Sequence, residues 1–235
     1  MTPTLPDVPV VETQIIELTN SFRAQNKLET VKSNAALTAV ARAYAAYLAK
    51  TGQFSHTADG HQSSERVTAG GYEWCETAEN LASFLDPRGF TTIDLAKSSV
   101  EGWINSPDHR KNMLAQYATE TGVGVVRAPG DKPKYISVQL FARPKALSYE
   151  FQISNSSGLP VTYSFGDEKE TIEPHFANRH TACFPSTLTF DKAGKGASAK
   201  AISGRYEAAG GVVYVLKPDK ALGVKVEIEK FQKVQ

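Results

Sequence analysis

The hydrophobic pattern of the chain changes its period near residue 146, and this change limits the fold more than any other feature. Before it, apolar residues recur every three to four positions, as on one face of an amphipathic helix. Beyond Pro144, short runs rich in β-branched and aromatic residues alternate with Gly, Pro, Asn or Asp. Two periods in one chain predict two cores. We therefore expect an extension at 1–11, a first domain at 12–146 and a second domain at 147–235.

The first domain is predicted to contain four helices, a short helical restart and then two strands. Residues 11–24 carry apolar side chains at helical spacing, and the Ala-rich residues 34–50 have Asn34 as N-cap and Gly52 as stop. The other expected elements are helices at 63–69 and about 94–105, a restart at Ser106-Pro107, and strands at 121–128 and 134–142.

The second domain is predicted to contain only strands. Its β-rich runs lie at 148–154, 160–165, 186–190, 204–209, 211–217 and 224–231. Short strands with turns between them are typical of a small sandwich or barrel. The expected fold class of the whole chain is therefore α+β, with an all-β domain second.

The composition argues against nucleic-acid binding and against a membrane span. The formal net charge is +1, and no cluster of Lys and Arg is present. No stretch approaches the ~20 apolar residues that a membrane helix needs. The Pro-rich N-terminus lacks a signal-peptide pattern, which fits a cytosolic start and equally a trimmed secreted protein that begins at an added methionine.

The stretch "INSPDHRKNML" places a histidine in an unusual position. Ser106 is predicted to be an N-cap and Pro107 the first helical residue, so His109 lies in the first helical turn. The positive end of a helix disfavours a second positive charge, which keeps this imidazole neutral. A metal site, or a base that works near physiological pH, requires a neutral imidazole.

Four local patterns together resemble a known family. They are "FSHTADG" at 54–60, "AENLA" at 78–82, "WINSPDHRKNM" at 103–113 and "TGVGVV" at 121–126. Their order and spacing resemble the CAP superfamily (cysteine-rich secretory proteins, antigen 5 and pathogenesis-related 1 proteins), and especially its bacterial branch. The resemblance covers roughly residues 12–143 and implies an α-β-α sandwich with a central cleft.

The resemblance also implies a functional site. The family's cleft is lined by two His and two acidic residues, which in several members hold a divalent metal such as zinc. His56, Glu79 and His109 match three of these positions, and Ser106 stands where the second acid is expected. Asp108 and Glu101 lie nearby without matching the motif. Zinc, if bound, is expected on His56 and His109 with Glu79 as a further ligand, and the same three residues would be catalytic in an enzyme.

The expected function is that of a secreted or periplasmic binding module whose His/Glu-lined cleft takes a lipid, glycan or peptide. One alternative is a metal-assisted hydrolase acting on a peptide or cell-wall substrate, because two neutral imidazoles and a carboxylate have the composition of a zinc site with a position open to water. The other is an adhesion protein that binds a protein partner through residues 147–235. Family members differ widely in function, so the fold alone does not choose among these.

Other conspicuous side chains have simpler interpretations. Trp103 and Tyr44 are expected in the core, since aromatic residues on helices mostly pack inward. Asn80 and Asn112 are expected to satisfy backbone groups at turns or helix ends.

Several charged and polar side chains are interpreted as solvent-facing. Glu65-Arg66 is expected to be an exposed charged pair. Ser55 is rejected as a nucleophile because no Gly-x-Ser-x-Gly elbow surrounds it. Solvated loop positions are expected for the three other histidines, His61, His175 and His180.

The two cysteines leave two states open. Cys75 and Cys183 form no CxxC pair, which excludes a thiolate cage around a metal. A disulfide between them would close a long loop and stabilise the fold by roughly 4–5 kcal/mol. Both have aromatic neighbours among which a small thiol packs well, and the resemblance to bacterial CAP domains implies no disulfide. We therefore expect two free, buried thiols.

Overall fold

The computed structural model describes residues 3–194, 196, 200–221 and 223–231, and the chain divides into two compact units between Ala146 and Leu147. The helices of the first unit are α1 (Val8–Gln25), α2 (Ala35–Thr51), α3 (Ser63–Ala69), α4 (Thr92–Ile104) and α5 (Pro107–Met113). Its strands are β1 (Lys32–Ser33), β2 (Trp74–Leu85), β3 (Glu120–Arg127) and β4 (Lys134–Pro144). The 3₁₀ turn η1 (Lys145–Leu147) follows β4.

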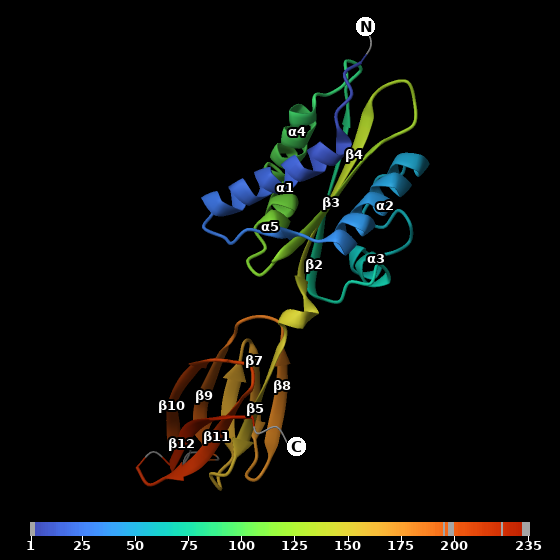
Figure 1. Ribbon diagram of the computed structural model, residues 1–235. Coiled ribbons are helices and arrows are strands. Elements are labelled where there is room, and N and C mark those ends of the chain that lie inside the picture. Colours follow the sequence, from blue (N-terminus) through green and yellow to red (C-terminus); the bar gives the residue numbers. More distant parts are fainter. Residues whose placement is uncertain (1–2, 195, 197–199, 222, 232–235) are drawn as a thin grey trace. The chain divides into compact units, whose positions relative to one another are not determined.

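The first unit is an α-β-α sandwich (Figure 1). Its strands pair in the order β1-β3-β4-β2. Helices α1, α4 and α5 bury apolar side chains against one face, and α2 and α3 bury theirs against the other. Strand β4 serves both faces because successive side chains alternate, so Phe141 joins the first cluster while Leu140 and Ala142 join the second. The predicted α+β class and the α-β-α sandwich are confirmed.

The predicted helix signals act as expected. The side chain of Asn34 accepts hydrogen bonds from the first backbone N–H groups of α2, and Gly52 ends that helix at φ 72°. Helix α1 starts three residues earlier than predicted, because the side chain of Asp7 caps it at Val10 N. Ser106 stands at the N-cap of α5 but makes no side-chain capping bond.

Strand β2 was not predicted, although it carries part of the candidate site. It pairs with β4 alone, at the edge of the sheet. Its first seven residues include Glu76, Thr77, Glu79 and Asn80, so the sequence shows no apolar alternation there. A strand of this kind is recognisable only from its pairing.

The "TGVGVV" pattern belongs to β3, where α2 lies very close to the sheet. A Cβ atom added to Gly122 would lie 2.2 Å from the backbone carbon of Leu37, and one added to Gly124 would lie 2.2 Å from the nitrogen of Arg42. Only glycine permits this approach of helix and strand backbones.

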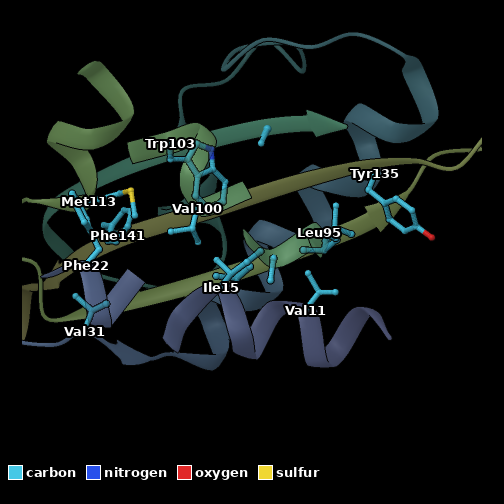
Figure 2. Close-up of a cluster of buried hydrophobic side chains, with 14 of the residues drawn as sticks. Val11, Ile15, Phe22, Val31, Leu95, Val100, Trp103, Met113, Tyr135 and Phe141 are labelled. Atoms are coloured by element: carbon cyan, nitrogen blue, oxygen red, sulfur yellow. The ribbon is translucent and has the colours of Figure 1, made fainter. Parts of the chain in front are cut away.

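The core on the α1 side contains the largest fully buried side chain among the described residues (Figure 2). Trp103 on α4 is 1% exposed, and its indole N–H donates to the carbonyl of Leu81 on β2 at 3.0 Å. The core prediction for Trp103 is therefore right.

The second unit is a sandwich of two four-stranded antiparallel-rich sheets, with strand orders β10-β9-β6-β7 and β12-β11-β5-β8. Apolar residues of both sheets share one core that contains Phe151, Tyr163, Phe190 and Tyr214. Of the two predicted architectures, sandwich and barrel, the sandwich is present. The strands are β5 (Tyr149–Asn155), β6 (Val161–Phe165), β7 (Glu168–Ile172), β8 (Ala177–Ala182), β9 (Thr187–Ala193), β10 (Lys200–Glu207), β11 (Val212–Asp219) and β12 (Gly223–Lys230).

Strands β7 and β8 were missed, and with them the position of one histidine. Both strands are rich in charged and polar residues, which hides their alternation. His180 lies on β8 and not in a solvated loop: its ring stacks on Phe151 at 5.0 Å, and Nε2 lies 2.9 Å from the hydroxyl of Tyr163. His61 and His175 are exposed, as expected.

The prediction of free thiols is wrong. Cys75 and Cys183 are both disulfide-bonded, and the chain has no free cysteine. Both residues are half-buried, so neither occupies the fully buried apolar position in which a thiol is inert. The neighbours along the sequence do not reveal the geometry around each sulfur, which decides whether a disulfide forms.

Candidate functional site

Two histidines from separate segments meet at one place on the first unit. His56 lies in the loop between α2 and α3, and His109 lies in the first turn of α5. Their ring centroids are 6.3 Å apart, and the ring planes are inclined by 52°. The His56 side chain is 50% exposed, so the pair opens to solvent. The predicted convergence of these imidazoles is present in the structure.

Glu79 lies beneath His56. Its side chain on β2 is only 3% exposed, and Oε1 is 2.8 Å from Nδ1 of His56. A carboxylate oxygen accepts hydrogen bonds, so Nδ1 is the donor in this contact and Nε2 lies outside it. The three residues matched by resemblance therefore lie together. Glu79 is buried more deeply than His56, which it contacts.

Arg66 is the residue of the site that the sequence interpretation missed. It does not face solvent: its side chain on α3 is 10% exposed. Its Nη2 donates to both carboxylate oxygens of Glu79, at 2.8 and 3.1 Å, and Nη1 donates to Asp59 at 2.9 Å. Its neighbour Glu65 caps α3 by accepting from the backbone of Gln62. The sequence carried no signal for this contact, because β2, which holds Glu79, was itself not predicted.

The same guanidinium also holds the His56 loop. It donates to the carbonyl of His56 at 3.1 Å and to that of His61 at 2.7 Å. Its central carbon lies 3.4 Å above the ring of Tyr44, a cation–π contact. Arg66 thus connects α2, α3, β2 and the loop.

Tyr44 is a core residue, as predicted, and it also fixes the loop. Its hydroxyl donates to the carbonyl of Ser55 at 2.5 Å and accepts from the backbone N–H of Ala58 at 3.1 Å. One turn later the hydroxyl of Tyr47 donates to the carbonyl of Ala58 at 3.1 Å. Burial raises the pKa of Tyr44, which keeps its hydroxyl protonated.

Two asparagines join the strand that carries Glu79 to the helix that carries His109. The Asn80 side-chain amide donates to the carbonyl of His109 at 3.1 Å. That of Asn112 donates to the carbonyl of Glu79 and to Oδ1 of Asn80. Both asparagines satisfy backbone groups, as predicted, but Asn80 does so from within strand β2 and not from a turn or a helix end. These bonds set the position of α5 on β2.

The surroundings of His109 favour the neutral form of its imidazole. Burial lowers the pKa of its imidazole, the charge of His56 lowers it further, and Asp108 acts in the opposite direction. This direction agrees with the expectation from its place in the first helical turn.

The acidic residues suggested for the fourth position do not complete a metal site. Glu101 lies on the outside of α4 and lines a different hollow, between α1 and α4. Within the described part of the chain, no group of three or more His, Cys, Asp or Glu side chains is arranged to hold a metal ion. Two imidazoles suit zinc as ligands, but zinc sites usually take three or four protein ligands. The residues therefore fit a full zinc site poorly.

A pocket of about 430 Å³ adjoins the site between α2 and α3. Arg66 and Asp59 belong to its wall as well as to the histidine site. The other lining residues are mostly apolar or aromatic: Ala39, Val40, Ala43, Tyr44, Tyr47, Ala69 and Gly70. The site thus has a polar part at the histidines and an apolar recess beside it.

Comparison with solved structures returns, among others, two chains that resemble this one over a little more than half of its length. An extracellular protein with an SCP domain from Bacillus anthracis is 25% identical, with a TM-score of 0.48 over 58% of this chain and 41% of that one. An outer surface protein of Borrelia burgdorferi is 21% identical, with a TM-score of 0.50 over 57% of this chain and 93% of that one.

Sequence comparison identifies the family. The uncharacterized membrane protein YlbC of Bacillus subtilis is 31% identical over 117 residues, which is 49% of this chain and 32% of YlbC. The chain thus spans about a third of the length of this relative. No helix among the described residues is long and apolar enough to cross a membrane. Residues 16–141 match the cysteine-rich secretory protein family, so the chain is a member of this family, the CAP family.

Proposed function

We propose that the first unit is a secreted or periplasmic binding module and that its ligand lies between His56 and His109. The observation that carries this proposal is the pair of facing imidazoles, 6.3 Å apart, above a carboxylate already occupied by Arg66. Because Glu79 orients His56 through Nδ1, the free Nε2 points away from that contact. The loop and α5 are both held by hydrogen bonds, so the site is preorganised, which favours binding.

The chemistry of the site favours a polar ligand over a purely apolar one. A neutral imidazole both donates and accepts a hydrogen bond, which suits hydroxyl and amide groups. Glycans and peptides offer such groups, whereas a lipid chain would have to use the apolar recess between α2 and α3. We therefore propose a glycan or a peptide of the cell surface as the ligand class. The disulfide-bonded cysteines support an oxidising compartment.

Calorimetric titration of the full chain tests this proposal with three probes. They are a soluble peptidoglycan fragment that carries a disaccharide and a peptide, the same disaccharide alone, and phospholipid vesicles. We expect the fragment to bind, and His56→Ala and His109→Ala each to weaken that binding about 10-fold or more, the loss expected from roughly 1.4 kcal/mol of contacts.

His61→Ala is the matched control, because this histidine is exposed and its ring lies outside the pair. It should bind as the wild type does. Binding that survives in both cleft variants, or no binding of the fragment or disaccharide, would reject the proposal. Binding of vesicles alone would assign a lipid ligand instead.

The hydrolase alternative uses the same three residues and stays a prediction. Zinc, when bound, would supply a Lewis acid that polarises a substrate carbonyl or activates water. His56 and His109 would hold it through ring nitrogens, and Glu79 would orient His56. The adhesion alternative, through residues 147–235, likewise stays a prediction.

A further inference from the structure

Arg66 occupies the place where a cation would balance the charge of Glu79. The Glu79 side chain is 3% exposed, and its two oxygens accept from Arg66 Nη2 and from His56 Nδ1. A carboxylate has about four lone-pair positions, and these contacts use three of them. The buried negative charge is thus already compensated inside the protein.

The position of Arg66 is set by these contacts and not by the best packing of its own side chain. Its Nε–H is buried and has no hydrogen-bond acceptor among the described residues. Buried donors without a partner are rare in native structures and are mostly found where another requirement fixes the side chain. Here the requirement is the set of five hydrogen bonds that both Nη atoms make to Glu79, Asp59 and two loop carbonyls.

We propose that Arg66 is a positioning and specificity-determining residue: it acts as the built-in cation of the cleft and keeps Glu79 from serving as a metal ligand. Zinc bound to Glu79 would lie ~2 Å from a carboxylate oxygen, in the immediate neighbourhood of the guanidinium. Two positive charges so close together repel strongly at a buried site. The inference rests on the proposed function because it takes the place between His56 and His109 as the ligand site. It predicts that this site selects a neutral polar ligand over a divalent ion.

Zinc binding by the full chain tests this inference, measured by competition with a chromogenic chelator near neutral pH. The wild type offers two imidazoles and should bind weakly. Arg66→Met should bind zinc about 10-fold more tightly or better, because the freed carboxylate of Glu79 becomes a third ligand. Adding Glu79→Gln to Arg66→Met should return the affinity to that of the wild type.

Arg42→Met is the matched control. Arg42 also pairs with a buried glutamate, Glu12, whose side chain is 7% exposed, but this pair joins α2 to α1 and contains no histidine. Loss of Arg42 should lower the melting temperature without changing zinc affinity. A merely structural role for Arg66 predicts that Arg66→Met also leaves zinc affinity unchanged.

Arg66→Gln keeps the inference refutable even where Arg66→Met fails to fold, because it removes the positive charge beside Glu79 but keeps a polar side chain that can donate to the carboxylate. It should also bind zinc more tightly than the wild type. Folded Arg66→Met or Arg66→Gln that binds zinc no more tightly than the wild type overturns the inference. Because the probe is zinc alone, neither outcome decides whether the cleft binds a glycan or a peptide.

Discussion

Arg23 offers a sharp test of what holds α5, and therefore His109, in place. This arginine on α1 is 0% exposed. Its Nε donates to the carbonyl of Glu29 at 2.8 Å, and Nη1 donates to that of Met113, the last residue of α5, at 2.7 Å. Nη1 and Nη2 donate further to the carbonyls of Ala115 and Ala118. One side chain thus satisfies the carbonyl at the end of α5, which the helix leaves without a donor, and three loop carbonyls near it.

Arg23→Met keeps a long side chain but leaves these four carbonyls without their donor. A buried polar group without a partner costs ~1–3 kcal/mol, so the low end of this range gives a loss of about 4 kcal/mol. Burial lowers the pKa of Arg23, which means that removing the charge recovers part of its desolvation cost. We expect a net loss of ~3 kcal/mol, or roughly 6–12 °C in melting temperature.

Thermal unfolding of the full chain measures this loss, with Arg88→Met as the control. Arg88 has a side chain that is 89% exposed and, among the described residues, forms an ion pair with Asp86 alone, so its replacement should leave the melting temperature unchanged. Hydrogen exchange should also accelerate in α5 of Arg23→Met. A melting temperature equal to that of the control would show that the desolvation of the guanidinium outweighs its hydrogen bonds, and the reasoning would be refuted.

Four further outcomes are expected. A lowered folded-state pKa of His109 gives full stability above the usual value of ~6.5 and a loss as pH falls below it, so His109→Gln should flatten this expected fall in denaturation scans run at several pH values. Gly124→Ala should lower stability by ~3 kcal/mol in urea denaturation, because its Cβ would meet the backbone of α2 at 2.2 Å, whereas Gly102→Ala, with 3.8 Å of room, should not. Thiol titration of denatured, non-reduced protein should find no reactive thiol, and one or two would contradict the disulfide-bonded state. Residues 1–146 carrying Cys75→Ser should unfold cooperatively on their own, and aggregation of that fragment would show that the two units depend on each other.

Local signals in the sequence were sufficient for the helices of the first unit. Helix α2 begins after Asn34 and ends at Gly52, as predicted, because capping and a left-handed C-terminal residue depend only on the chemistry of a few neighbouring residues. The change of hydrophobic period likewise predicted a helical unit followed by strands. Edge and polar strands such as β2, β7 and β8 were not predicted, because such a strand is defined by its pairing with another strand and not by its own hydrophobic pattern.

The candidate site likewise contains residues that were found from the sequence and residues whose role only the structure shows. Its histidines and Glu79 were found from motifs that resemble those of the family. The lowered pKa of His109 has the direction expected from its helix position, but its causes are burial and His56. The oxidation state of the cysteines and the role of Arg66 depended on which groups meet in space. Arg66 looked like half of an exposed charged pair, and only the folded chain brings it to Glu79, Asp59 and the carbonyl of His56. A charged side chain acquires its function from partners that are distant in sequence, because electrostatic and hydrogen-bond energies depend on separation and burial and not on order along the chain.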